Sequence, residues 1–178
     1  HADRAVPIPR FHTPLMLLPL PDRKVFHVER YSYAMRSMAT PYAQVYTSRG
    51  CIHECPYCPV PALRPDGFDA RLPEQVVTEW KALVEEHGIK SIHVEDDNFM
   101  EDPQRVRDIC EHLRASNHTF QWELVNGIRV DQVDAHLLER MAQAGCTRIV
   151  FSFEHLSDGG SPAVGYNLQT AKQAVHSA

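Results

Sequence analysis

Hydrophobic and polar residues follow two different rhythms along this chain from residue 42 onward. Short apolar runs of strand length occupy residues 43–48, 89–95, 119–125 and 147–153. Between them, apolar residues recur at i, i+3, i+4 and i+7, which indicates amphipathic helices with one face on a core. A parallel strand pair needs a crossover of about a dozen residues or more. The alternation therefore predicts an α/β fold of about four βα units with parallel strands.

The expected helices carry recognisable start and stop signals. Pro73 suits the first turn of the first helix, and Gly88 suits its exit. Asp102 is the expected cap of the second helix, directly before Pro103. Asp131 is the expected cap of the third. A weaker helical pattern follows in residues 161–178.

The first 41 residues differ from the rest because they hold six of the chain's 13 prolines and no lasting periodicity. We expect an extended lead-in over residues 1–41, lying on the outside of a core domain formed by residues 42–178.

Polar residues gather directly after the predicted strands. They occur at Cys51–Cys58, at "EDDN" (95–98), at "NGIR" (126–129) and at Glu154 with His155. Two folds fit the pattern, a doubly wound sheet and a partial TIM-like (βα) barrel, and in both the carboxyl edge of the strands carries the active site. Four loops are therefore expected to converge on one place.

Composition narrows the functional classes. Lys and Arg number 18 against 23 Asp and Glu, a net charge of −5, and the basic residues are scattered, which argues against a large nucleic-acid-binding surface. No apolar run reaches membrane-spanning length, and the Pro-interrupted "PLMLLPLP" lacks the marks of a signal peptide, so we expect a cytoplasmic protein. Because the chain begins at His1, we expect a processed product or part of a longer protein.

Three of the five cysteines lie within eight residues, in the spacing C-x3-C-x2-C. Structural zinc needs four ligands, and His53 lies only two residues from Cys51 and from Cys55, a cramped spacing. A disulfide with one spare thiol is a second alternative. Three thiolates suit a cubane iron–sulfur cluster with one iron left open. Four other residues have plainer interpretations, Cys110 and Cys146 as core thiols and His93 and His155 as packed or hydrogen-bonded side chains.

The cysteine motif, with Tyr57 directly before its third cysteine, resembles that of the radical S-adenosylmethionine (radical SAM) enzymes. "YAQVYTSRGCIHECPYCPVPALR", "GIKSIHVEDDNFM" and "NGIRVDQVDAHLLERMAQAGC" are similar to the radical domain of the cobalamin-binding subfamily, over about residues 42–154. The resemblance implies a 4Fe-4S cluster that reductively cleaves SAM to a 5′-deoxyadenosyl radical, used for methylation of an unactivated centre. It also implies a small-molecule or peptide substrate and an electron donor such as flavodoxin or ferredoxin.

The resemblance assigns a role to particular positions. Cys51, Cys55 and Cys58 would ligate the cluster, and Tyr57 would lie against the adenine of SAM. The SAM ammonium is expected among Glu95, Asp96, Asp97 and Asn98, although not all four can be contacts. Asn126, Arg129 and Glu154 would face the ribose hydroxyls and the carboxylate. The alternatives are loop packing for Tyr57, a solvated turn for the acidic run and a structural ion pair for Arg129.

The chain departs from the family pattern in three respects. Glu154 lies in "SFEHLSDGG", without the glycines that usually flank it, and the chain ends soon after the fourth strand. There is no D-x-H-x-x-G motif, so cobalamin would sit on a domain outside this chain or be absent. The alternatives to an enzyme are a non-catalytic zinc or iron–sulfur module and an inactive, cluster-binding barrel fragment.

Overall fold

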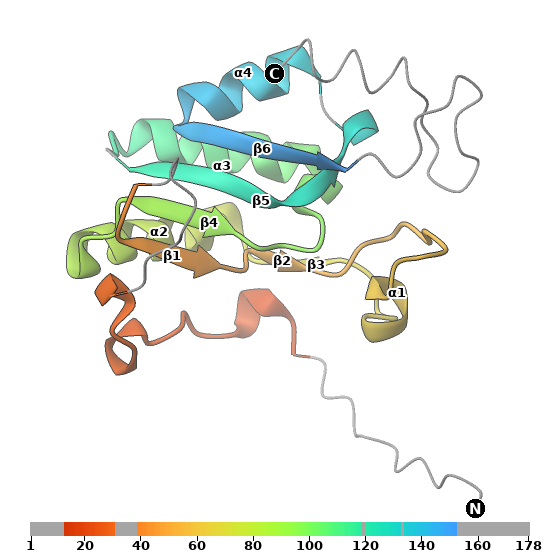
Figure 1. Ribbon diagram of the computed structural model, residues 1–178, viewed down its shortest axis with the longest axis horizontal. Coiled ribbons are helices and arrows are strands. Elements are labelled where there is room, and N and C mark those ends of the chain that lie inside the picture. The colour runs from red at the N-terminus through yellow and green to blue at the C-terminus, as the bar shows by residue number, and fades with distance from the viewer. Residues whose placement is uncertain (1–12, 31–38, 119, 133, 153–178) are drawn as a thin grey trace, which may run out of the picture.

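The computed structural model describes residues 13–30, 39–118, 120–132 and 134–152. Its centre is a parallel sheet of four strands, β1 (Tyr42–Val45), β4 (Ser91–Val94), β5 (Gln121–Arg129) and β6 (Cys146–Ser152), in that spatial order (Figure 1). Their crossovers contain the helices α2 (Pro73–His87), α3 (Pro103–Ala115) and α4 (Ala135–Gln143). The predicted α/β class with parallel strands is confirmed.

The core lies between the sheet and its crossover helices. Alternate strand residues such as Val45, Ile92 and Trp122 pack against Trp80 of α2 and Leu113 of α3 in one buried cluster. The helices α2 and α3 run behind the sheet in Figure 1. Sequential strand order with helices on one face is the arrangement of a (βα) barrel segment. A doubly wound sheet would instead reverse its strand order and carry helices on both faces. No described helix is long and apolar enough to cross a membrane.

Most of the helix signals are confirmed, and one is wrong. Pro73 begins α2, and Gly88 ends it with a φ of +65°. Asp102 caps α3 by accepting hydrogen bonds from the backbone N–H groups of Gln104 and Arg105. Asp131 does not cap α4: the cap is Asp134, which accepts from the Leu137 N–H at 2.8 Å.

The misplaced cap has a physical reason, which is that β5 continues further than its apolar run suggests. The strand extends through Arg129, and a 3₁₀ turn, η5 (Val130–Gln132), follows it before α4 begins. Asn126 and Arg129 therefore lie on β5 itself and not beyond it. Gly127 permits this extension, because a Cβ there would lie 1.8 Å from Ser152 Oγ on β6.

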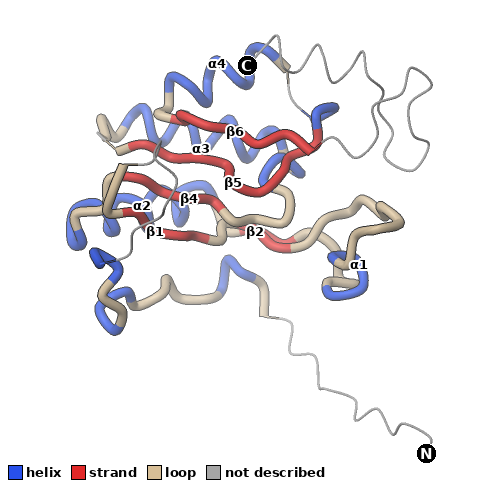
Figure 2. Tube along the Cα trace, in the orientation of Figure 1, coloured by secondary structure: helices blue, strands red, loops and turns tan. Residues whose placement is uncertain are grey.

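The segment after β1 leaves the sheet and forms a small antiparallel ladder, which the sequence patterns did not predict. Ser48–Arg49 (β2) pairs with Asp69–Ala70 (β3), and the cysteine loop and the short helix α1 (Val60–Leu63) lie between these two strands. Figure 2 shows this long loop projecting beyond the carboxyl ends of the strands.

The described part of the lead-in begins against this ladder and continues along α2 and β1. It contains three 3₁₀ turns, η1 (Leu15–Leu17), η2 (Arg23–Val25) and η3 (Val28–Arg30), in place of a fully extended chain. The Asp69 carboxylate accepts from the Leu15 N–H at 3.0 Å. The buried Arg71 guanidinium donates to the carbonyls of Leu15, Leu18 and Pro19. The division into a lead-in over residues 1–41 and a core domain stays a prediction, and the weak helix expected in 161–178 lies outside the described residues.

A buried carboxylate joins the end of β4 to the chain that leaves β1. Asp96 accepts hydrogen bonds from the Thr47 N–H at 2.6 Å, the Thr47 hydroxyl at 2.5 Å and the Ser48 hydroxyl at 2.6 Å. The side chain of Arg105 donates to the Thr47 carbonyl at 2.9 Å and to the Arg71 carbonyl at 3.0 Å. Burial raises the pKa of Asp96, and these hydrogen bonds and the charge of Arg105 oppose the rise.

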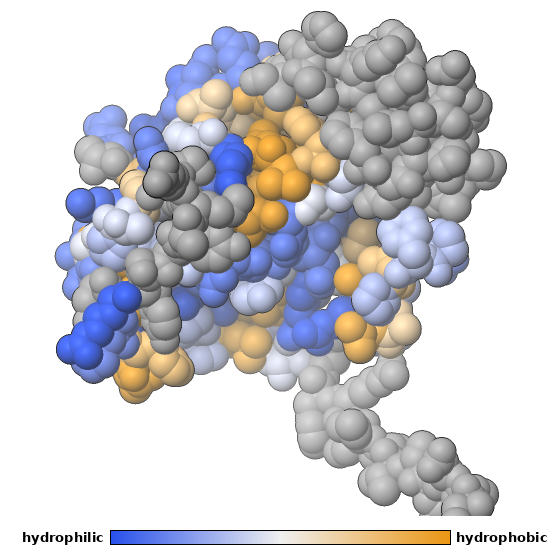
Figure 3. Space-filling view, viewed as in Figure 1, coloured by the Kyte–Doolittle hydropathy of each residue, from blue (hydrophilic) through white to orange (hydrophobic). Residues whose placement is uncertain are grey.

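A row of polar side chains crosses the sheet on the face opposite to the helices. Strand register places Gln44, His93, Glu123 and Arg148 opposite one another on β1, β4, β5 and β6. The His93 ring stacks on Tyr42 at a centroid distance of 4.3 Å, which confirms the expectation of a packed histidine. Glu123 pairs with Arg148 at 3.0 Å. In the view of Figure 3, hydrophilic residues gather across the middle of the molecule.

Replacing the buried carboxylate tests its role in the fold. Asp96→Asn should lower the free energy of unfolding by about 1–3 kcal/mol, because the amide places a donor where the carboxylate accepts from two hydroxyls. Urea unfolding of the apoprotein measures this change. The control is Glu95→Gln, next along the chain, where the carboxylate bonds to Gln44 in an exposed contact and the change should be below about 1 kcal/mol. Equal losses in the two variants would contradict the assignment.

The stacked histidine predicts a pH dependence of stability. Burial, assisted by the positive charge of Arg148, lowers the pKa of His93 to about 4. Native His93 therefore stays neutral between about pH 4 and 6.5 while the unfolded state binds a proton. Because the unfolded state binds more protons, this contribution to the free energy of unfolding falls as the pH drops through that window, by at most about 1.4 kcal/mol per pH unit.

His93→Gln should remove that component, so its loss of stability between pH 7 and pH 5 should be smaller than that of the wild type in urea titrations. His112→Gln, at a half-exposed position on α3, should keep the wild-type slope. A wild-type slope in the His93 variant would show that the histidine does not resist protonation in the native state.

Candidate functional site

The three clustered cysteines lie on the loop that follows β2 at the carboxyl edge of the sheet. Cys51, Cys55 and Cys58 are partly buried and free, and the Cys58 N–H donates to the Cys55 carbonyl at 3.0 Å. Gly50 begins the loop with a φ of +80°, and a Cβ there would lie 2.0 Å from the carbonyl oxygen of Gly67. The loop therefore needs glycine at its entrance, both for its backbone conformation and for this close approach.

The sulfur of Cys51 faces two side chains from the segment after β4. The amide nitrogen of Asn98 lies 3.7 Å from Cys51 Sγ, and Glu101 Oε2 lies 3.4 Å from it. Asn98 Nδ2 also donates to Glu101 Oε2 at 2.7 Å. Burial raises the pKa of the Cys51 thiol and the nearby Glu101 carboxylate adds to the rise, whereas the His53 N–H and the Asn98 amide oppose it.

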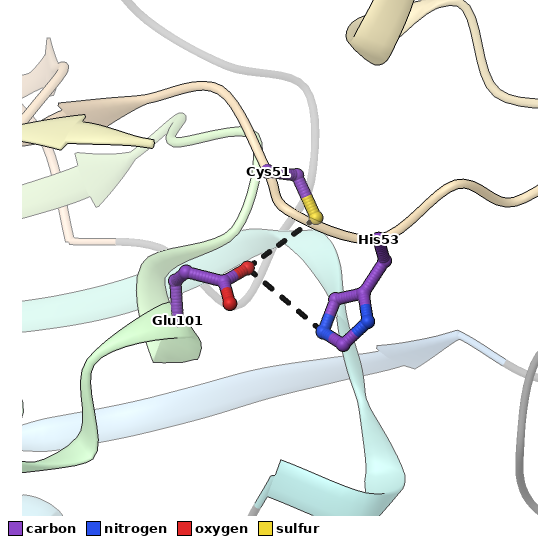
Figure 4. Close-up of side chains that lie close together, drawn as sticks. All are labelled: Cys51, His53 and Glu101. Atoms are coloured by element: carbon purple, nitrogen blue, oxygen red, sulfur yellow. Dashed lines mark hydrogen bonds and ion pairs between the residues drawn. The ribbon is translucent and has the colours of Figure 1, made fainter. Parts of the chain in front are cut away.

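His53 completes this group from the cysteine loop itself. Its Nε2 lies 3.9 Å from Glu101 Oε2, and Figure 4 shows one carboxylate oxygen facing both the sulfur and the ring. Gln132 Nε2 lies 3.2 Å from the same histidine nitrogen. The loop is thus held from two sides, by η4 (Phe99–Glu101) and by η5.

Cys55 faces β5. Arg129 Nη1 lies 4.0 Å from Cys55 Sγ, and the same guanidinium pairs with Asp131 through contacts of 2.6 and 3.1 Å. Arg129 is therefore both the ion-pair partner that one interpretation expected and a cation beside a candidate cluster ligand.

The four residues of the acidic run point in different directions. Glu95 accepts from the Gln44 side chain at 2.9 Å on the open face of the sheet. Asp96 is buried among Thr47 and Ser48, so its carboxylate is engaged in the fold. Asp97 accepts from the Gly50 N–H at 2.7 Å and fixes the entrance of the cysteine loop. Of the four, only Asn98 touches a cysteine.

Two other predicted residues have distinct placements. Asn126 donates to the backbone carbonyls of Glu95 and Asp96, at 2.9 and 3.2 Å, so its side chain joins β5 to the acidic run. Tyr57 is 56% exposed, and both its expected position against adenine and the loop-packing alternative stay predictions. Glu154 and His155 lie outside the described residues. Cys110 and Cys146 pack in or against the core, where burial raises the pKa of each thiol to about 12, as expected of core thiols.

The three cysteines fit a multi-iron cluster, and a compact set of single-ion ligands lies beside them. Among the described residues, the set of His, Cys, Asp and Glu side chains whose ligand atoms all lie within 4.8 Å of one another is Cys51, His53 and Glu101. The three cysteines do not form such a set. A cubane binds each thiolate to a different iron and does not require the sulfurs to converge on one point. Asn98 Oδ1 is buried without a hydrogen-bond partner among the described residues, beside Cys51, and an added group with a donor could satisfy it.

Glu101 is the residue of this site that the sequence patterns missed. The motif comparison ended at "EDDNFM", one residue before it, and the residues around it read as the approach to a helix cap. The available signal is its position three residues after Asn98, because a 3₁₀ turn places residues i and i+3 on the same side.

The comparisons with known proteins agree with the motif. The chain is 27% identical over 143 residues to a cytidylyl-2-hydroxyethylphosphonate methyltransferase from Streptomyces wedmorensis, covering 77% of this chain and 26% of that protein. It is 31% identical over 110 residues to a hopanoid C-2 methylase from Rhodopseudomonas palustris, covering 61% of this chain and 19% of the methylase. The chain thus spans about a quarter or less of these relatives.

Solved structures share the fold. The radical S-adenosylmethionine methyltransferase TsrM from Kitasatospora setae, determined with cobalamin and a [4Fe-4S] cluster, matches with a TM-score of 0.67 at 17% identity, over 76% of this chain and 28% of TsrM. The cobalamin-dependent S-adenosylmethionine radical enzyme OxsB matches with a TM-score of 0.65 at 22% identity, over 75% of this chain and 21% of OxsB.

The family pattern itself covers most of the chain. The family model described as "Radical SAM superfamily" matches residues 45–178, from the end of β1 onward. This range contains the cysteine loop and all three crossover helices. The chain therefore belongs to the radical SAM superfamily, and its distant homologues include methyltransferases of that superfamily.

Proposed function

We propose that this chain is the catalytic segment of a radical SAM methyltransferase that works with cobalamin. Cys51, Cys55 and Cys58 would hold a 4Fe-4S cluster, which supplies the electron for reductive cleavage of SAM when bound. The observation that carries the proposal is the placement of three free, partly buried thiols on one loop at the carboxyl edge of a parallel sheet. Family membership supports the cluster and SAM as cofactors.

The chain's own residues would bind and orient these groups. Asp97 holds the start of the cysteine loop through the Gly50 N–H. Asn98 offers a buried, unsatisfied carbonyl oxygen beside Cys51, which suits the ammonium of SAM. Tyr57 presents an exposed ring on the same loop, which suits the adenine. Arg129 is a cation next to Cys55, within reach of an anionic group such as the carboxylate of SAM.

The methyltransferase part of the proposal rests on the relatives. Two curated relatives are named for methyl transfer, to a cytidylyl phosphonate and to a hopanoid. The cobalamin part rests on the resemblance of three motifs to the cobalamin-binding subfamily. Because the chain contains no D-x-H-x-x-G motif, cobalamin would be carried by a domain outside these residues.

One observation favours a second candidate function, a zinc-binding module without catalysis. Cys51, His53 and Glu101 form a compact set of a thiol, an imidazole and a carboxylate, all of which are zinc ligands. This site would use one cysteine of the motif and leave Cys55 and Cys58 without a role, which is why we rank it second.

Reconstitution separates the candidates. After anaerobic incubation with iron and sulfide, the chain should contain about four iron and four acid-labile sulfide per molecule. After chemical reduction it should release 5′-deoxyadenosine from SAM, detected by liquid chromatography. Cys55→Ala should lose both properties, because it removes a ligand from the cluster. Cys146→Ala, a thiol packed against the core, is the matched control and should retain both.

Each contrary result has a distinct meaning. About one zinc and no sulfide would replace the proposal by the zinc module. A cluster without SAM cleavage would indicate a cluster-binding but inactive barrel fragment. Retention of the full cluster in Cys55→Ala would contradict the ligand assignment.

A further inference from the structure

The carboxylate of Glu101 is placed beside a candidate cluster ligand although no part of the motif requires an acid there. Its side chain is 5% exposed, and Oε2 lies 3.4 Å from Cys51 Sγ. A buried carboxylate is costly unless donors hold it. Donors must therefore hold Glu101 in place, and its charge lies close enough to affect a cluster bound to the sulfur.

The contacts of Glu101 do not depend on the cysteine proton. Asn98 Nδ2 donates to Oε2 at 2.7 Å, and the Ile52 N–H donates to it at 3.5 Å. His53 Nε2 lies 3.9 Å away. A cysteine that binds iron has lost its proton, so its sulfur can no longer donate to the carboxylate. The remaining donors are the Asn98 amide, from the segment after β4, and the Ile52 N–H, from the cysteine loop, and they would still hold Glu101 beside the sulfur.

The same geometry gives Asn98 two donor contacts from one amide. Its nitrogen carries two hydrogens, and it lies 2.7 Å from Glu101 Oε2 and 3.7 Å from Cys51 Sγ. By accepting one of these hydrogens, the carboxylate fixes the orientation of the amide and leaves the other directed at the sulfur. Glu101 therefore acts on Cys51 both directly, through its charge, and indirectly, through Asn98.

The two influences act on a cluster in opposite directions. A hydrogen bond to a ligating sulfur offsets the extra negative charge of the reduced state and raises the reduction potential. A nearby carboxylate repels that added electron and lowers the potential, and it does so strongly where water is excluded. Asn98 and Glu101 therefore have opposite effects on the reduction potential of a cluster bound through Cys51.

We propose that Glu101 is a positioning residue that sets the reduction potential of the cluster through Cys51, lowering it by its own charge while it orients the Asn98 amide. This inference rests on the proposed function, because it requires a cluster on Cys51. A low potential makes the reduced cluster a stronger electron donor, which suits the cleavage of a sulfonium. The residue need not touch SAM to act in this way.

The test is an EPR-monitored redox titration of the reconstituted chain, without SAM. Glu101→Gln keeps the size of the side chain and removes its charge. The ratio of reduced to oxidised cluster at a fixed solution potential should rise about tenfold, an upward shift of about 59 mV for a one-electron couple. Asn98→Ala removes the donor to the sulfur and should shift the potential downward. Glu95→Gln removes the same charge from a residue bonded to Gln44 and should leave the potential unchanged.

The outcomes are separable. An unchanged or lower potential in Glu101→Gln would overturn the inference, as would an equal shift in Glu95→Gln, which would indicate a general field and not a positioned group. Loss of the cluster in a folded Glu101→Gln protein, checked by circular dichroism, would show a role in assembly and would also overturn it. If wild-type protein assembles no cluster, the proposed function fails with the inference. If it assembles one and the variants do not differ, the inference alone fails.

Discussion

The carboxylate of Asp96 is the constraint on which the geometry of the site depends. It lies just beyond the end of β4, is 2% exposed, and accepts three hydrogen bonds from the two residues that carry the chain away from β1. A buried carboxylate of this kind is tolerated only where donors and a compensating charge surround it. Arg105 supplies the charge and, through the Thr47 and Arg71 carbonyls, binds the backbone on both sides of the ladder.

This arrangement explains why the side chains of consecutive residues in the acidic run contact different parts of the protein. The side chain of Asp96 turns into the interior, and the next residue, Asp97, reaches the backbone of Gly50. Asn98 then faces Cys51, and Glu101 follows one 3₁₀ turn later. The ends of β1 and β4 are thereby tied at several successive points. The cysteine loop, which is mostly exposed, owes its position to these contacts more than to its own packing.

The alternation of apolar runs was enough to predict the sheet and its crossover helices, because each helix hides one apolar face and each strand is buried by it. The roles of Pro73 as helix start, Gly88 as helix end and Asp102 as cap were predicted correctly, because each residue acts within one turn of its own backbone. The prediction that Asp131 caps α4 was wrong because the position of the cap depends on where β5 ends. The strand continues past its apolar run and pairs with β6 there. The β2–β3 ladder was not predicted, because its four residues pair across the cysteine loop and show no periodicity of their own.

Some residues of the candidate site could also be predicted from the sequence, and others could not. The three cysteines could be identified because their spacing is local, and spacing alone already argued against a disulfide framework. Which acid of "EDDN" faces which neighbour could not be derived, because the choice depends on hydrogen bonds to Thr47, Gly50 and Gln44, 47 to 51 residues away in sequence. Glu101 was missed because it follows the compared motif and because Cys51 and Ile52, which it contacts, lie on the cysteine loop about 50 residues earlier. A residue that acts through an Asn98 amide and a cysteine sulfur leaves no spacing pattern of its own, so only the folded arrangement could reveal it.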